Sequence, residues 1–421
     1  MITLVEALNY RCLRYVSQPL GPFHILVGPN ASGKSTFLDV LSFLGQLLEF
    51  GLQETIRKRV SDPRDLLFGR EGEKFELAVE FAIPEKFLPA LLNEQWKTIR
   101  YEVAIGIDPY SGEPAILAEN VIFKDNDEDP CTQKTLFPEE KFLPHTLLSE
   151  GPREDLKRII HKGPKAGTSI FISEPDSEDR HILTFQFGDK RSAFANLVED
   201  LEKFPVSTWL KNSLKQSIRK VILDSNQIRL ASPPGQTKQF QDDGANLPWV
   251  LKTFKENYEP EFRDWIAHLQ TALTDLKDIL VYERPDDHHC YIKLTYSTKT
   301  EDIVVPSWLA SDGTLRLLTL TLLAYLPETT GVFMIEEPEN GIHPLAVETM
   351  YQSLANVIDA QILVASHSPV LLSMANPEQV LCFAKDRTGA TDIISGDNHP
   401  HLVDWQRDTN LGELFAAGVL G

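Results

Sequence analysis

Apolar and polar residues alternate at strand spacing through much of the first half of the chain. Five such runs are separated by turn-rich segments, without a helix-length pattern at each crossover, which predicts an antiparallel β layer. The runs are Phe75 to Ile83, Ile99 to Ile107, Ala115 to Phe123, Thr168 to Ile172 and His181 to Phe187. Between about 125 and 165 the chain is acidic and contains prolines, so we expect an irregular insertion or loop there.

Helical spacing dominates the middle of the chain. From about Ala193 to Leu223 and from Leu247 to Val281, apolar residues recur every three or four positions, with an interruption near Pro260. We interpret the aromatic residues of the second stretch as ordinary core. Strand patterns return at Tyr291 to Tyr296 and at Ile303 to Val305.

Buried strands alternate with helices in the last third of the chain. An apolar helix, Leu315 to Leu326, precedes the strand Val332 to Ile335, and the helix Pro344 to Ile358 precedes the strand Gln361 to Ala365. This alternation predicts a mostly parallel sheet covered by helices, so the fold class is α/β. Ligands of such sheets bind beyond the carboxyl ends of the strands.

The chain has 421 residues, which is long for a single core. The pattern predicts an N-terminal lobe with the antiparallel layer at 1–192, a helical insertion at 193–284 and a C-terminal lobe at 285–421.

One short segment near the N-terminus predicts a nucleotide site. Ile25 to Thr36 reads I-L-V-G-P-N-A-S-G-K-S-T and contains the G-x-x-x-x-G-K-[ST] phosphate loop, between a buried strand and an apolar helix. The glycines let the backbone approach phosphate oxygens at a helix N-terminus. Lys34 is expected to reach the β- and γ-phosphates and Ser35 to hold Mg²⁺. The expected ATP-binding residues here are Gly28, Pro29, Asn30, Ala31, Ser32, Gly33, Lys34, Ser35 and Thr36.

Polar residues that follow two later strands are candidates for the chemistry. Glu336 ends the predicted strand and is a second candidate ligand of Mg²⁺, while Glu337 is expected to polarise the attacking water. His367, after the next strand, is expected to donate a hydrogen bond to the γ-phosphate. Taken singly, a strand-end carboxylate is often a helix cap and a histidine an ordinary polar group. A phosphate loop in the same chain favours the catalytic interpretation.

The net charge of −20 disfavours unspecific binding to a polyphosphate backbone. Two basic stretches could still contact DNA, although we favour a solvated helix face for each. They are Lys157, Arg158, His161, Lys162 and Lys165, and then Lys211, Lys215, Arg219 and Lys220. Tyr10 and Tyr15 are candidates for stacking on adenine, or plain sheet residues.

The four cysteines are scattered without a C-x-x-C pair, which argues against a zinc site and a disulfide framework. No apolar run approaches the roughly 20 residues that span a bilayer. The N-terminus lacks a basic segment followed by an apolar core. We therefore expect a cytoplasmic protein that does not contact the membrane.

Several motifs together resemble those of ABC-type ATPase heads. Besides the phosphate loop they are Ser311-Asp312-Gly313-Thr314, the stretch I-E-E-P-E-N-G-I-H-P from Ile335 to Pro344, and Ser366-His367-Ser368-Pro369. Within these heads the chain resembles the branch that contains Rad50, RecF, the SMC proteins and the OLD-family ATPases of phage defence. Glu336 stands where many ABC-type heads have Asp, and members of the OLD-like branch also have Glu there. The signature of this chain is S-D-G-T instead of S-G-G-Q.

The resemblance implies a homo-oligomer in which two heads face each other across ATP. Ser311 and the Gly313 amide would contact the γ-phosphate bound by the partner head, and Asn340 and His343 would lie near the seam. Hydrolysis would then let the heads part. The long coiled coil of Rad50 and SMC proteins is absent from the sequence.

About fifty residues follow His367, which is too few for the Toprim nuclease domain that OLD proteins fuse to this head. We therefore expect an ATPase that controls a separate effector subunit, a Toprim or other nuclease, in anti-phage defence. The alternatives are a DNA-repair ATPase similar to RecF or Rad50, which binds DNA in an ATP-dependent way, and a nucleotide-sensing scaffold that does not hydrolyse ATP.

Overall fold

The computed structural model describes residues 1–398 except 92–95, 109–111, 126–142, 152, 154, 164–167, 176–181 and 328, and leaves the side chain of residue 90 undescribed. Much of the predicted irregular insertion lies outside the described residues. The chain forms two compact units. The first contains 1–21, 30–218 and 383–393, and the second contains 22–29, 219–382 and 394–421. This division differs from the three expected parts, which remain a prediction.

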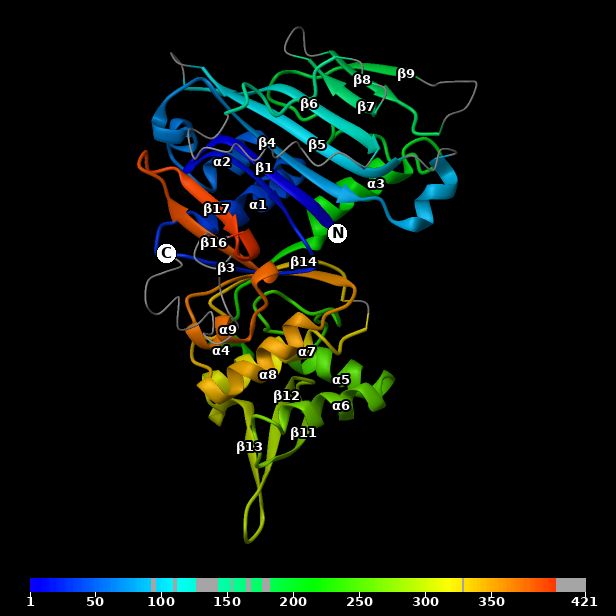
Figure 1. Ribbon diagram of the computed structural model, residues 1–421. Coiled ribbons are helices and arrows are strands. Elements are labelled where there is room, and N and C mark those ends of the chain that lie inside the picture. Colours follow the sequence, from blue (N-terminus) through cyan, green and yellow to red (C-terminus); the bar gives the residue numbers. More distant parts are fainter. Residues whose placement is uncertain are drawn as a thin grey trace. The chain divides into compact units, whose positions relative to one another are not determined.

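A six-stranded sheet runs in the order β10-β14-β15-β3-β16-β17, and most of its strands lie in the second unit (Figure 1). Strand β14 pairs in parallel with β15, β15 with β3, and β3 with β16. The predicted mostly parallel sheet is therefore confirmed. The strands are β3 (Phe23–Val27), β10 (Ile218–Val221), β14 (Gly331–Glu336), β15 (Ala360–Ala365), β16 (Val380–Lys385) and β17 (Thr391–Ser395).

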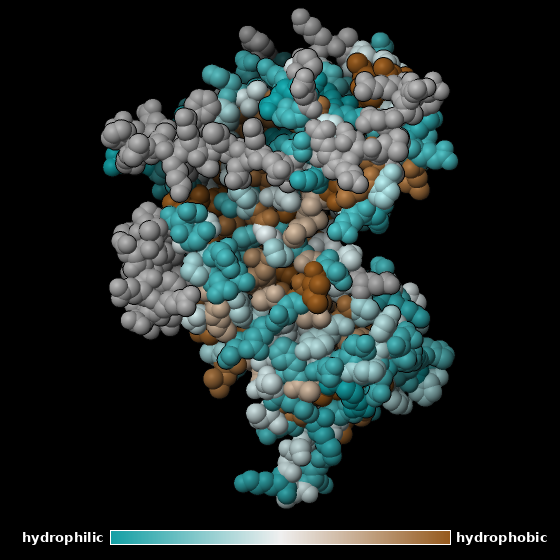
Figure 2. All heavy atoms as spheres, turned by 45° about the vertical axis from the view of Figure 1, so that its right-hand side comes forward, coloured by the Kyte–Doolittle hydropathy of each residue, from teal (hydrophilic) through white to brown (hydrophobic). Residues whose placement is uncertain are grey.

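Helices and a small antiparallel sheet, β11-β12-β13, complete the second unit. Both predicted helical stretches are wrong in their last part. Ile218–Val221 of the first forms strand β10, and in the second α6 ends at Leu269 and Leu276 already belongs to a strand. Hydrophilic residues cover most of the lowest part of Figure 2, where this small sheet lies. The elements are α4 (Ser225–Ile228), α5 (Leu247–Asn257), α6 (Glu259–Leu269), α7 (Asp312–Leu322), α8 (Pro344–Ala355), α9 (Pro369–Met374), β11 (Leu276–Glu283), β12 (Cys290–Ser297) and β13 (Asp302–Pro306).

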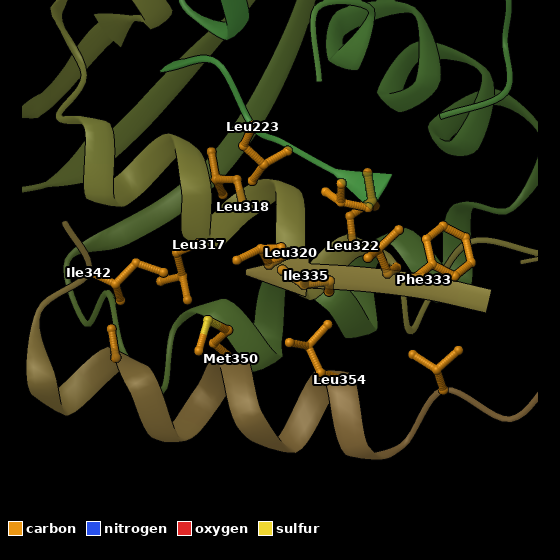
Figure 3. Packing of buried hydrophobic residues seen from close by; sticks show 14 of the residues in the cluster. Leu223, Leu317, Leu318, Leu320, Leu322, Phe333, Ile335, Ile342, Met350 and Leu354 are labelled. Carbon is orange, nitrogen blue, oxygen red and sulfur yellow. The ribbon is translucent and has the colours of Figure 1, made fainter. Parts of the chain in front are cut away.

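The core of the second unit lies where α7, β14 and α8 pack together. Leu317 of α7 and Met350 of α8 point toward one another, and both are at most 1% exposed (Figure 3). Ile335 of β14 and Leu354 of α8 belong to the same cluster. Burying each such side chain contributes about 1.5–3 kcal/mol, so this packing fixes the strand that carries Glu336.

The first unit contains an eight-stranded sheet in the order β2-β1-β4-β5-β6-β7-β8-β9 (Figure 1). Each neighbouring pair is antiparallel, which confirms the predicted β layer. The strands are β1 (Ile2–Tyr10), β2 (Leu13–Pro19), β4 (Lys74–Ala82), β5 (Trp96–Ile107), β6 (Pro114–Asp125), β7 (Leu156–Lys162), β8 (Thr168–Ile172) and β9 (Ile182–Gln186), and the helices of this unit are α1 (Lys34–Phe50), α2 (Leu52–Arg57) and α3 (Pro205–Asn212).

The two basic stretches are not solvated helix faces. The first supplies β7, apart from Lys165, which lies outside the described residues. Lys162 of β7 is 1% exposed and donates to the carbonyls of Gly188 and Arg191 at 3.0 and 2.6 Å. In the second, α3 ends at Asn212, and Lys211 is buried and donates to the Leu197 carbonyl. Hydrogen bonds to backbone carbonyls compensate for the burial of Lys162 and Lys211. The local sequence does not reveal these partners.

Tyr10 is a sheet residue and is not available for stacking on adenine. Its side chain is fully buried in a cluster with the rings of Phe43 and Phe75. Its hydroxyl donates to Asp39 of α1 at 2.7 Å, which ties β1 to the helix that follows the phosphate loop.

A buried charge network crosses the first sheet. The Arg100 guanidinium, 7% exposed, lies 2.6 Å from Glu6, 2.9 Å from Glu80 and 2.6 Å from Glu102. It also donates to the Leu147 carbonyl at 3.1 Å. Burial acts to lower the pKa of Arg100, but the carboxylates of Glu6, Glu102 and Glu80 outweigh it and raise the pKa. Arg100 therefore stays charged and neutralises acids on three strands.

The substitution Arg100→Met is expected to destabilise the first unit by about 3–5 kcal/mol, because it removes this counter-ion from the buried carboxylates of Glu6 and Glu102, while Glu80 keeps its contact with Lys124. Urea unfolding followed by circular dichroism measures the effect. The control Arg153→Met removes an exposed ion pair with Asp155 and should change stability by less than about 1 kcal/mol. Equal effects of the two substitutions would contradict the importance of the network.

Candidate functional site

The phosphate loop begins at the carboxyl end of β3, and its backbone has the strained turns that a phosphate cradle needs. Positive φ angles occur at Gly28 (147°), Ala31 (61°) and Gly33 (107°). Helix α1, 17 residues long, begins immediately afterwards at Lys34. An anion at such a helix N-terminus is stabilised by free amides and the helix dipole.

The side chains of the loop differ in exposure. Lys34 is buried at 8% exposure, whereas Asn30, Ala31 and Ser35 are exposed and Thr36 is half-buried. The Ser32 hydroxyl is buried and has no hydrogen-bond partner in the part of the chain that the structure describes. An unpaired polar atom at the loop fits a site completed by a phosphate.

Thr391 of β17 contacts the phosphate loop, a role that the sequence does not indicate. Its hydroxyl donates to the Ser32 carbonyl at 2.9 Å, and its amide donates to the Cys12 carbonyl at 2.9 Å. A Cβ on Gly33 would lie 2.2 Å from this hydroxyl, so Gly33 is required by the close contact as well as by its φ. No local signal marks Thr391, because it lies 359 residues from Ser32 in sequence.

The register of three parallel strands places the acidic candidates and His367 at one edge. Glu336 is level with Ala365 of β15, and Ala365 is level with Leu26 of β3. The Glu337 amide continues the ladder to the Ala365 carbonyl at 2.7 Å. The residues after all three strands therefore meet at the edge where Gly28 and Pro29 start the phosphate loop.

Glu337 has a constrained conformation. Its φ of 47° is rare for a residue with a side chain, and strain of this kind collects at functional sites. The side chain is exposed, and the Asn340 amide donates to its carboxylate at 2.5 Å. The Glu337 carboxylate is therefore exposed to solvent and held by Asn340 in the turn after β14.

Glu339 joins the ends of β14 and β15, a role that the sequence did not indicate. Its Oε1 atom accepts from the Ser366 hydroxyl at 2.6 Å and from the His367 amide at 3.3 Å. Ser366 is fully buried, and His367 is half-buried. The contact fixes the backbone of His367 relative to the turn that carries Glu337.

The segment Ser311 to Thr314 starts α7, and Ser311 is its N-cap, accepting from the Thr314 amide at 3.1 Å. Ser311 is exposed and Gly313 half-buried. A Cβ on Gly313 would lie 2.1 Å from the Gly341 carbonyl. Gly313 is therefore needed for close packing of this segment against the turn after Glu337, and His343 caps the next helix.

The two candidate metal ligands, Ser35 and Glu336, carry oxygen donors of the kind that suit a magnesium ion bound together with a nucleotide. Among the described residues there is no group of three or more His, Cys, Asp or Glu side chains that could hold a metal ion. Mg²⁺ commonly uses one or two protein oxygens with substrate phosphates and water. The Glu336 carboxylate already accommodates a cation, since its Oε1 lies 2.7 Å from the Lys220 ammonium.

A phosphate loop after a parallel strand, with two acids and a histidine after the neighbouring strands, defines an ABC-type ATPase head of the branch that contains Rad50, the SMC proteins and the OLD-like ATPases. Residues 23–373 match the family described as "AAA domain, putative AbiEii toxin, Type IV TA system". The chain belongs to this family.

The chain is also similar to individual proteins, in sequence to one relative and in fold to an Smc head. The chain is 23% identical over 400 residues to an OLD nuclease of Thermus scotoductus, covering 92% of this chain and 62% of that protein. It thus spans less than two thirds of the relative's length. An Smc head, solved bound to the C-winged helix domain of ScpA, matches with a TM-score of 0.53 and 13% identity over 93% of this chain and 97% of that one. An SMC head of Thermotoga maritima matches with a TM-score of 0.42 and 10% identity over 94% of this chain and 98% of that one.

None of the described helices is both long and apolar enough to cross a membrane.

The substitution Gly313→Ala is expected to destabilise the second unit by about 1–3 kcal/mol, because the added methyl group must displace the turn at Gly341. Thermal unfolding monitors the loss. Gly188→Ala is the control, since a Cβ there meets nothing within 4 Å. If both variants melt with the wild type, Gly313 is not packed as described.

Proposed function

We propose that this chain binds ATP with Mg²⁺ and hydrolyses it. The backbone of Gly28 to Thr36 and the Lys34 ammonium bind the phosphates, and the metal, held by Ser35 and Glu336, supplies charge neutralisation to them. Glu337 orients and polarises the attacking water, while His367 donates to the γ-phosphate. The single observation that supports this assignment most strongly is the strand register, because it places both acids and His367 at the edge where the phosphate loop begins.

Two heads of this chain associate across the nucleotide in the proposed mechanism. The exposed Ser311 and the amide of Gly313 complete the phosphate site of the partner head. The likeness of the fold to an Smc head supports this arrangement. ATP then acts as an interfacial ligand, and its loss weakens the association.

The proposed biological role is control of a separate nuclease subunit in anti-phage defence, in the cytoplasm. The similarity to an OLD nuclease, of which the chain spans 62%, supports a link to nuclease chemistry. The net charge of −20 and the burial of Lys162 and Lys211 favour a controller over a protein that coats DNA.

ATP turnover by the purified chain, measured with and without duplex DNA, tests the proposal. We expect hydrolysis that does not require DNA. Strong stimulation by DNA with a steep salt dependence would favour a repair ATPase instead. Tight ATP binding without any turnover would identify a nucleotide-sensing scaffold.

Lys34→Ala is expected to weaken binding of a fluorescent ATP analogue by at least about 100-fold, because a buried ammonium that contacts phosphates contributes several kcal/mol. Lys58→Ala, which removes an exposed lysine of the same unit, should bind normally. Unchanged affinity in a folded Lys34→Ala protein would refute the phosphate site.

Glu337→Gln is expected to retain ATP binding but lower kcat by about 100-fold or more, because the amide cannot accept a proton from water. The variant should accumulate as an ATP-bound dimer, which light scattering detects. Glu348→Gln, an exposed acid on α8, is the control. Wild-type turnover by Glu337→Gln would show that another group serves as the base.

A further inference from the structure

A lysine contacts the carboxylate that we assign to the metal. The Lys220 ammonium on β10 lies 2.7 Å from Oε1 of Glu336, the last residue of the neighbouring strand β14. The Lys220 side chain is 45% exposed and the Glu336 side chain 31%. Both residues belong to the second unit, so the contact does not depend on how the two units are placed.

The preceding residue on the same strand has a different task. Arg219 forms an ion pair with Asp242, donates to the Phe240 carbonyl and lies over the ring of Phe333 with its guanidinium 5.0 Å from the centroid. Successive side chains of a strand point to opposite faces. Arg219 therefore packs against the Phe333 ring, whereas Lys220 reaches Glu336 at the end of β14. Packing of the fold thus accounts for Arg219, whereas the contact of Lys220 is with the candidate site.

An ammonium and a divalent cation compete for the same carboxylate. Each is attracted by the negative charge of Glu336, and each repels the other at a separation of a few ångströms. The ammonium can leave without unfolding the strand, because it sits at the end of a flexible four-carbon chain that is already half exposed.

We propose that Lys220 is a displaceable counter-cation of Glu336, and this inference rests on the proposed function. In the nucleotide-free protein the ammonium occupies the cation position and holds the carboxylate at the strand end. Arrival of the magnesium–nucleotide displaces it. Lys220 therefore sets the Mg²⁺ concentration at which the nucleotide becomes bound with its metal.

Lys220→Met tests the proposal, because methionine keeps an unbranched chain and removes the charge. The fluorescent ATP analogue is held at constant concentration while Mg²⁺ is titrated. We expect half-maximal metal-dependent binding at about three- to tenfold lower Mg²⁺ than in the wild type. Mn²⁺ binding in the presence of ATP, followed by electron paramagnetic resonance, should tighten by the same factor. An unchanged or higher metal requirement would overturn the proposal.

Lys252→Met is the matched control, since Lys252 pairs with Glu283 at 2.5 Å with similar exposure but on α5 and β11. It should leave the Mg²⁺ requirement unchanged. In a Glu336→Gln background, Lys220→Met should have no further effect, because the shared carboxylate is gone. A full effect of Lys220→Met in that background would also overturn the proposal.

The same titration separates this inference from the proposed function. If the wild type and Lys34→Ala bind the analogue equally, the nucleotide site itself is wrong. If the wild type binds through Lys34 and requires Mg²⁺, but Lys220→Met does not shift that requirement, only the role of Lys220 fails.

Discussion

The parallel register of β14 on β15 and of β15 on β3 is the constraint on which the candidate site depends. It makes Glu336, Ala365 and Leu26 level, so that residues separated by hundreds of positions in sequence leave the sheet at one edge. Because successive strand residues face opposite sides, a slip of one residue would replace Phe333 and Ile335, in the cluster with α7 and α8, by the differently shaped side chains of the other face. The burial of residues such as Ile335 therefore stabilises the register, and the register in turn positions the polar groups. Packing and chemistry are linked through the same strand.

The parts of this arrangement that the sequence predicts are those with a local cause. The phosphate loop is recognisable because glycines, a lysine and a hydroxyl must stand at fixed spacing between a strand and a helix. The buried strands of the parallel sheet are recognisable because both faces are covered. The roles of Glu339, Thr391 and Lys220 have no such local cause, since each arises from contact with a distant segment. Strand β7 was missed for a related reason: Lys162 is buried by bonding to carbonyls that the next segments supply, so its polar character concealed a strand position.

Polar burial stabilises the two units in different ways. In the first unit, Arg100 is surrounded by carboxylates of three strands, and this network holds the sheet together. In the second unit, one oxygen of Glu339 spans only the gap between two strand ends, and its other oxygen has no hydrogen-bond partner among the described residues. A network that is fully paired favours rigidity, whereas a carboxylate with a spare acceptor can take a new donor without losing its first contacts.

The adjacent carboxylates of Glu336 and Glu337 at the end of β14 each contact a different polar neighbour. The carboxylate of Glu336 faces the Lys220 ammonium, and that of Glu337 accepts from the Asn340 amide. Without such partners, like charges on consecutive residues would repel each other. The two partners differ in kind, since a lysine neutralises charge and an amide only orients it. Neutralisation suits a group whose eventual ligand is a cation, and orientation without neutralisation suits a group that must remain basic toward water. The choice of neighbours therefore distinguishes the two carboxylates in the way that their proposed roles require.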